Sequence, residues 1–404
     1  MPVHRAVPGD ARTPPTPATY RSVLRVPHAR RLLAGTLLGR MPSGMMPLAL
    51  LLGPVPAPGA LAALYLVASG VGGPLTSRAA DRHGPRAVLA VSATASSMAM
   101  AVLAAGVREP GPAAGLVAVA GLAHPPLDAA LRARFGARGM MPSLAHQRVA
   151  LALDSATQEL LHITAPLLVG VLTVTASGGW TLAAAAVVGA AGTGLFVCTL
   201  PATTRLPQKC AKGHAGWWVP LQCRGLRIFY LAMGCVGIPI GALTPLAVQQ
   251  AGQLHAPALS PALPAALSCA SFVGGLAYGA RAWPGGTTRQ LTVLAAVFAA
   301  GWLPALTTPH PVWAVFAVAL PGAVLAPLLA AGYTLTGLLA PPGHAIQSHA
   351  LLVAALDAGC ALGTAVAVAT HSALVLPAAA ACAALMLATT RTRLTPTSPG
   401  PGPA

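Results

Sequence analysis

The sequence predicts an all-α integral membrane protein with twelve transmembrane helices in two pseudo-symmetric six-helix bundles. Three observations predict this fold class: an apolar composition, apolar segments of membrane-spanning length, and basic residues in alternate connections. Of the 404 residues, 55% are hydrophobic and 8% are charged, and the mean hydropathy is +0.70. Because a soluble domain needs a more polar surface, the chain is expected to be solvated mainly by lipid.

Twelve apolar segments are long enough to cross a bilayer. A helix needs about 20 apolar residues to span roughly 30 Å of hydrocarbon, and proline and glycine are tolerated inside such helices. We expect spans at residues 32–53, 59–79, 87–107, 111–132, 149–175, 179–200, 226–249, 260–281, 290–308, 311–333, 348–370 and 372–390.

The basic residues predict the orientation of these spans. Twenty-two of the 24 Lys and Arg residues lie in the terminal segments or in connections on one side. Arg108 lies in a connection on the other side, and Arg40 lies inside the first span. Because Lys and Arg are retained in the cytoplasm, both termini are expected there. This distribution follows the spans rather than forming a patch, so nucleic acid is not an expected partner.

Polar segments divide the chain into five expected regions. The abundance of Ala, Gly, Pro and Arg is typical of a GC-rich bacterial genome, so we expect a multi-pass protein of the bacterial inner membrane. The regions are a cytoplasmic tail (1–31), a six-helix bundle (32–200), a cytoplasmic loop (201–225), a second six-helix bundle (226–390) and a second cytoplasmic tail (391–404).

A weak internal repeat relates the two expected bundles. Similar segments recur about 200 residues apart, a pattern typical of transporters built from repeats. Chance similarity between Ala-, Leu- and Gly-rich segments is the alternative. The pairs are MPLAL and TPLAV, VGGPLTSRA and VGGLAYGAR, and ALALD (ending at Asp154) and VAALD (ending at Asp357).

The densest group of ionisable side chains is SRAADRHGPRAVL, between the second and third expected spans. Asp81, at a helix end, can accept hydrogen bonds from arginines or from the N-terminus of a facing helix. Gly84 and the proline after it predict a tight turn. Asp128, near the cytoplasmic end of the fourth span, is the expected partner of Arg82 or Arg86. A loop that only sets the topology is the alternative.

This stretch resembles the signature between the second and third helices of the major facilitator superfamily, roughly G-x-x-x-D-R-x-G-R-R. Asp81, Arg82, Gly84 and Arg86 fit, whereas Ser77 replaces the first glycine and a proline replaces a basic residue. With the span number and the repeat, the resemblance covers nearly the whole chain. It implies the major facilitator fold and a conformational latch that joins the bundles at their cytoplasmic faces. Several segments resemble poorly characterised actinobacterial carriers.

The fifth expected span contains APLLVG, which resembles the antiporter signature G-P-x-x-G-G of that superfamily at Pro166 and Gly170. The resemblance implies a bend of the fifth helix and an efflux-type carrier. The basic residue that many drug exporters of the superfamily have in the fourth span has no counterpart before Asp128, and Arg40 is the candidate to replace it.

Charged residues inside the spans are the candidates for proton coupling. Each costs roughly 2.5–3.5 kcal/mol on insertion scales, so each needs a reason. Glu159 and Arg40 lie at comparable depths, about 16 and 13 Å into their spans, and we expect them to pair. His162 shares a helix face with Glu159. A static ion pair is the alternative to proton coupling by Glu159. Asp357, about 12 Å into the eleventh span, is a second candidate.

These observations predict a secondary transporter that exports a small amphipathic molecule in exchange for protons and acts as a monomer. A proton-coupled importer and a non-transporting sensor or assembly protein on a degenerate carrier fold are the alternatives. No nucleophile elbow, HExxH motif or phosphate loop is present, so the chain is not expected to be an enzyme or to hold a cofactor. Cys210, His214 and Cys223 lack a CxxC pair, so no metal site is expected.

Overall fold

The computed structural model describes residues 18–137, 140–175, 178–200, 219–281 and 283–389, and these residues contain helices and no strand. The N-terminal part (residues 18–200) consists of α1 (Tyr20–Arg25), α2 (Ala29–Leu52), α3 (Pro58–His83), α4 (Pro85–Ala104), α5 (Pro110–Leu122), α6 (Leu127–Gly136), α7 (Leu144–Thr175) and α8 (Gly178–Thr199). The C-terminal part (residues 219–389) consists of α9 (Val219–Gln222), α10 (Arg224–Gln253), α11 (Leu259–Gly279), α12 (Thr287–Gly301), the 3-10 helix η1 (Leu303–Leu306), α13 (Pro311–Leu339), α14 (Ala345–Thr370) and α15 (Val375–Thr389).

Within the described residues, nine helical segments are long and apolar enough to cross a membrane. They coincide with nine of the twelve expected spans. The other three expected spans correspond to α2, α7 and the 15-residue α15. The structure therefore supports an all-helical, multi-pass membrane protein.

The fourth expected span is interrupted rather than continuous. It consists of α5 and α6, which are separated by the short segment that contains His124, Pro125 and Pro126. Proline lacks a backbone N–H and its ring clashes with the preceding turn, so two consecutive prolines end the helix. The expectation of one helix over 111–132 is corrected, and α6 begins as a separate helix whose side chains face the rest of the molecule.

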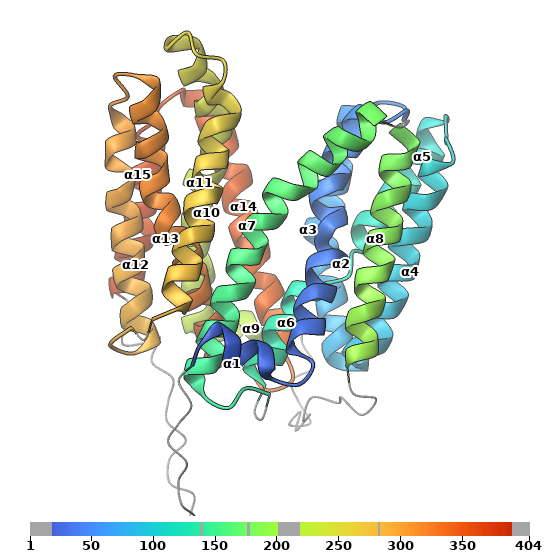
Figure 1. The fold of residues 1–404 in the computed structure, drawn as a ribbon, viewed down its shortest axis with the longest axis horizontal. Helices are drawn as coiled ribbons and strands as arrows, with labels where there is room; N and C mark the ends of the chain where they lie inside the picture. The colour runs from blue at the N-terminus through green and yellow to red at the C-terminus, as the bar shows by residue number, and fades with distance from the viewer. Residues whose placement is uncertain (1–17, 138–139, 176–177, 201–218, 282, 390–404) are drawn as a thin grey trace, which may run out of the picture.

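The helices of each part pack mainly against one another. In the N-terminal part α2 and α4 pack on α8, and α3 packs on α5; in the C-terminal part α10 packs on α14 and α15, and α11 packs on α13. Two seams connect the parts: α14 packs on α3 and α6, and α7 packs on α11 and α13. Figure 1 shows α7 in the middle of the molecule, between helices of the two parts.

Glycine permits the closest of these contacts. A Cβ added at Gly237 or Gly241 of α10 would overlap backbone atoms of α14, and one at Gly359 or Gly363 of α14 would overlap backbone atoms of α10. Small residues allow membrane helices to approach to backbone contact, where dispersion forces replace the hydrophobic effect that lipid removes. The two helices thus form a rigid pair.

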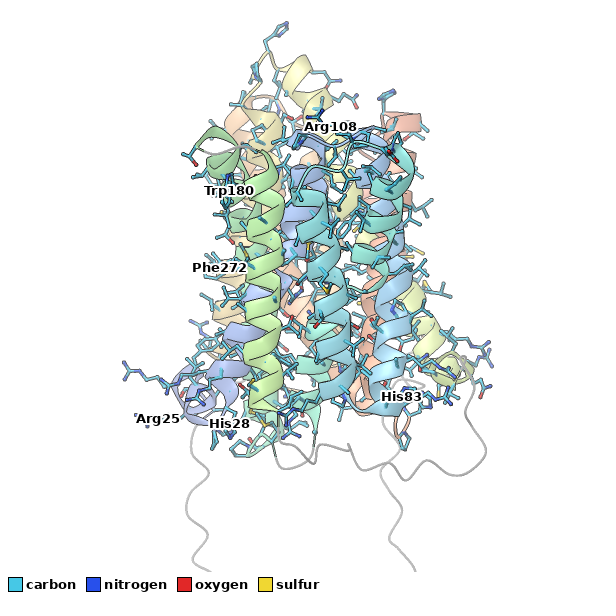
Figure 2. All side chains as sticks on the ribbon, turned by 90° about the vertical axis from the view of Figure 1, so that its right-hand side faces the viewer. Arg25, His28, His83, Arg108, Trp180 and Phe272 are labelled. Carbon is cyan, nitrogen blue, oxygen red and sulfur yellow. The ribbon has the colours of Figure 1, made fainter. Side chains whose placement is uncertain are left out.

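The two ends of the molecule differ in charge. Arg25, His28 and His83 lie at one end of the helices, which we call the basic end, and Arg108 lies at the opposite end (Figure 2). The turn between α3 and α4 and the connection between α6 and α7 lie at the basic end. This separation agrees with the alternation of basic connections in the sequence.

Candidate functional site

Asp81 connects α3 to α14 at the basic end. It lies in the last turn of α3 and is 6% exposed. Its Oδ1 accepts a hydrogen bond from the backbone N–H of Ile346 (3.2 Å), and its Oδ2 accepts one from that of Gln347 (2.8 Å). The first N–H groups of a helix lack partners within it, and the helix dipole favours a negative charge there. A facing helix N-terminus, one of the two kinds of partner expected for Asp81, is therefore present.

The rest of this stretch forms the turn and its exposed basic face. Gly84 ends α3 with φ +94°, a left-handed conformation that favours glycine, and α4 begins at the next residue. Arg82 and Arg86 are exposed. Asp128, the expected partner of either arginine, forms its ion pair within α6 instead. The sequence expectation for this contact is corrected.

Arg132 of α6 is the centre of a buried polar cluster and is 0% exposed. Its Nε donates to Asp154 Oδ2 (2.7 Å), its Nη1 to Asp128 Oδ2 (3.1 Å) and its Nη2 to Gln158 Oε1 (2.9 Å). These three acceptors lie on α6 and α7 of the N-terminal part. A buried guanidinium is stable only when its fixed donors are matched in this way.

The ion pair expected between Arg40 and Glu159 is not the one that forms. Arg40 Nη1 lies 3.5 Å from Asp154 Oδ1, so Asp154 serves two arginines. Arg40 and Glu159 lie at similar depths in their expected spans, but depth along a helix does not determine on which face a side chain lies. Asp154 lies on the face of α7 that meets α2 and α6.

Tyr333 of α13 extends the Arg132 cluster into the C-terminal part. The Arg132 guanidinium carbon lies 3.6 Å from the centre of the Tyr333 ring, within the range of a cation–π interaction. Both side chains are 0% exposed. The face of the guanidinium therefore contacts a neutral ring of one part, while its edges bond to carboxylates of the other.

Glu159 lies deeper along α7 and also contacts the C-terminal part. Ser271 of α11 donates to Glu159 Oε1 (3.0 Å), and the same hydroxyl accepts from the backbone N–H of Ala326 in α13 (3.1 Å). His162 Nδ1 lies 3.7 Å from Glu159 Oε2. Glu159 is buried, whereas the His162 side chain is 53% exposed. The structure thus brings together two of the predicted coupling residues, Glu159 and His162.

Asp357 is the fourth predicted coupling residue. It lies on α14, is exposed, and interacts electrostatically with Asp128, His162 and Arg40 of the N-terminal part. No ion pair of Asp357 is found among the described residues. Asp357 therefore faces the charged residues of α2 and α7 without joining their cluster.

Two further hydrogen bonds link the parts near the basic end. Arg148 Nη2 of α7 donates to Thr287 Oγ1 of α12 (3.1 Å). The hydroxyl of Tyr20 in α1 donates to the carbonyl of Leu276 in α11 (2.5 Å). The polar contacts between the parts therefore extend from the basic end to Glu159.

The α7 helix is continuous from Leu144 to Thr175, so Pro166 and Gly170 lie inside a helix. No described atom lies within 4 Å of the position of a Cβ at Gly170. Another helix therefore does not approach Gly170 closely in this conformation, and the bend that the antiporter-like motif implies stays a prediction.

The described residues contain no group of three His, Cys, Asp or Glu side chains placed to hold a metal ion. Cys210 and His214, at which the sequence predicts no metal site, lie outside the described residues.

The fold is that of solved membrane transporters. The human organic anion transporter MFSD10 (TETRAN) has a TM-score of 0.69 at 15% identity, covering 95% of this chain and 100% of that chain. A bacterial homologue of the iron transporter ferroportin in an outward-facing state has a TM-score of 0.66 at 14% identity, covering 91% and 98%. The E. coli fucose:proton symporter FucP has a TM-score of 0.65 at 13% identity, covering 91% and 97%.

These similarities define the fold. FucP, one of the structures that share it, is a major facilitator superfamily transporter. The search against family models finds no match for this chain. The search of curated proteins finds no match either. The shared architecture extends over nearly the whole length of each of these structures, while the low identity leaves substrate and direction open.

Sequence reasoning found most charged residues of this region but missed their neutral partners. Ser271 and Tyr333 are single polar residues in apolar spans and carry no motif. Arg132 was assigned to the basic connections, although its i,i+4 spacing from Asp128 was a usable signal. The break at the two prolines moves Arg132 onto a separate helix and into the interior.

Proposed function

We propose that the chain is a secondary transporter of the bacterial inner membrane that moves a small amphipathic molecule by alternating access. Its twelve spans would form two six-helix halves, with the basic end and both termini in the cytoplasm. The fold shared with solved transporters supports the class, and the basic connections support the orientation.

One observation carries this proposal. Polar contacts join the two parts at the basic end, and the residues of α7 and α14 are more exposed toward the other end. On α7, residues 149–152 near the basic end are buried in succession, whereas beyond Glu159 only one face stays buried: Ala165 and Val169 are 0% exposed, and Leu167 and Val171 are 63% and 58% exposed. On α14 the first turns are buried, and exposure increases beyond Asp357. A carrier closed on one side of its central site has this distribution.

We propose that transport is export coupled to protons, with Glu159 as the coupling residue and Arg40, His162 and Asp357 modifying it. Glu159 supports this role because its carboxylate bonds to Ser271 of the other part, so a change in its charge alters a contact that must break during transport. His162 is exposed beside it and provides a route for a proton. The antiporter-like motif at Pro166 and Gly170 supports the direction.

The test compares wild type with Glu159→Gln and Glu109→Gln in a bacterial host that lacks its major efflux pumps. Glu109 is the other glutamate of the chain and lies at the start of α5, away from the Arg132 cluster. Accumulation of a varied panel of dyes and antibiotics is measured with and without a protonophore. Wild type and Glu109→Gln should lower accumulation, and the protonophore and Glu159→Gln should each abolish the effect.

Three other results would change the assignment. Protonophore-sensitive export that persists in Glu159→Gln would move the coupling role to Asp357. Raised accumulation that depends on the proton gradient would favour an importer. An expressed, folded wild type that alters the accumulation of no compound would favour a narrow substrate or a non-transporting protein.

A further inference from the structure

The short α1 helix lies at the seam between α7 and α11. Only Val26, Pro27 and His28 separate α1 from α2, so α1 is tied to the N-terminal part. It packs on α7, and its Val23 side chain is 0% exposed within a cluster made mostly of C-terminal residues. A segment outside the spans is thus built into the interior of the basic end.

Tyr20, the first residue of α1, carries the contact with the C-terminal part. Its hydroxyl donates to the carbonyl of Leu276 (2.5 Å) and lies 3.3 Å from that of Gly275, both in the last turns of α11. The Leu276 carbonyl also accepts the backbone N–H of Ala280, so the tyrosine uses the second lone pair of this oxygen. Burial raises the pKa of Tyr20 to about 12, so the hydroxyl keeps its proton over the physiological range.

The slot that holds Tyr20 is made by small residues. A Cβ at Gly279 would overlap the Tyr20 hydroxyl and would lie 2.9 Å from Ala152 Cβ of α7. One turn earlier on α11, a Cβ at Gly275 would lie 3.3 Å from Ala156 Cβ. The tyrosine therefore lies where α7 of one part meets α11 of the other, and any other side chain at Gly279 would displace it.

The end of α1 that carries Tyr20 is itself fixed in place. Thr19 and Ser22 form a capping box: Ser22 N–H donates to Thr19 Oγ1 (3.2 Å), and Thr19 N–H donates to Ser22 Oγ (2.9 Å). A six-residue helix is not stable alone, so its order depends on these caps and on its packing against α7. Release of Tyr20 would therefore free the whole helix.

We propose that α1 is an autoinhibitory clasp that holds the basic end closed through Tyr20, and that its release is required each time this end opens. This inference rests on the proposed function, because only a carrier needs that end to open. The clasp adds a contact that the spans do not supply, from a segment that lies outside the membrane and is within reach of cytoplasmic factors.

The test measures hydrogen exchange at the first turn of α14 in the full-length protein in lipid nanodiscs. The N–H groups of Ile346 and Gln347 bond to Asp81 only while the basic end is closed, so their exchange reports its opening. Tyr20→Phe removes the hydroxyl and keeps the ring. Tyr278→Phe is the matched control, because its hydroxyl bonds to Gln290 within the C-terminal part (2.8 Å).

The clasp predicts exchange about fivefold faster in Tyr20→Phe than in wild type, a size expected for one hydrogen bond. Exchange in Tyr278→Phe should stay within about twofold of wild type. Gly279→Ala, which fills the slot and leaves Tyr20 in the chain, should act like Tyr20→Phe. Equal exchange in wild type, Tyr20→Phe and Tyr278→Phe would overturn the clasp alone. A first turn that never exchanges in any variant would overturn the clasp and the carrier function together.

Discussion

The two parts of the molecule meet with opposite chemistry. Six of the seven acidic residues of the chain lie before residue 160, and only Asp357 lies in the second half. At the seam the N-terminal part supplies carboxylates and guanidinium groups. The C-terminal part contributes backbone N–H groups, the hydroxyl of Ser271 and the ring of Tyr333.

This difference has a physical consequence for opening. In the proposed transport cycle, separation of the parts would leave Arg132 bonded to Asp154, Asp128 and Gln158, because all lie in the same part. The Tyr333 ring, which Arg132 leaves behind on the C-terminal part, is neutral. Removing one partner of a buried ion pair is far more costly than removing a neutral one, so this division keeps the ion pairs of Arg132 intact when the seam opens.

The largest loss of stability should come from replacing Arg132, the centre of the charged cluster on the N-terminal part. Arg132→Met would leave Asp154 and Asp128 without their main partner in the interior, at an expected cost of about 3–5 kcal/mol in stability. Thermal unfolding of the purified protein in detergent measures the loss. Arg134→Met, two residues along α6, is the control, because the described residues offer Arg134 no ion pair. Similar losses in both variants would show that the cluster is not a stabilising unit.

A smaller effect is expected where a charge of one part meets backbone groups of the other. Asp81→Asn removes the charge that binds the α14 N-terminus, and hydrogen bonds to charged groups contribute about 1.5–3 kcal/mol. Hydrogen exchange of the first α14 turn should rise by tenfold or more, on the order of that energy. Asp357→Asn is the control, because Asp357 lies on α14 but outside this contact. This variant should leave the hydrogen exchange of the first α14 turn unchanged. Faster exchange in both would show a general loosening of α14.

The sequence predicted the helices and the charged side of the seam better than the neutral side. Span positions follow from apolar length, whereas the orientation that Arg placement indicates stays a prediction. Asp81 could be recognised because a signature surrounds it. The ion-pair partner of Arg40 could not be predicted. Three carboxylates on neighbouring helices are candidates, and the direction of each side chain decides which of them Arg40 contacts.

The neutral side was not predictable for a different reason. Ser271 and Tyr333 look like ordinary polar residues of apolar helices, and their role depends on which helices of the other part face them. The break between α5 and α6 depends on Pro125 and Pro126, whose effect in a membrane helix varies with the neighbours that satisfy the backbone. Such features depend on tertiary contacts that a local pattern does not contain.

Ser271 offers a test of moderate size. Ser271→Ala removes the donor to Glu159 and the acceptor of the Ala326 N–H, so we expect a loss of about 1–2 kcal/mol, measured by thermal unfolding. Ser155→Ala is the matched control: Ser155 is also buried, but its hydroxyl bonds to Leu151 within α7. The control should change stability by less than about 0.5 kcal/mol. Equal losses would remove the distinction between bonds across the seam and bonds within one helix.

The smallest effect separates the ring of Tyr333 from its hydroxyl. Among the described residues the hydroxyl has no hydrogen-bond partner, whereas the ring lies 3.6 Å from the Arg132 guanidinium carbon. Tyr333→Phe keeps the ring and should change stability by less than about 0.5 kcal/mol, while Tyr333→Leu should lose about 1–2 kcal/mol, because a desolvated cation–π contact has that size. Thermal unfolding of both variants decides between these roles. If Phe lost as much as Leu, the hydroxyl would be the contact, and the C-terminal part would supply a directional bond that must be broken. If only Tyr333→Leu is destabilised, the Arg132 guanidinium contacts a neutral ring face. Such a face can slide and separate from the guanidinium while the ion pairs of Arg132 stay intact.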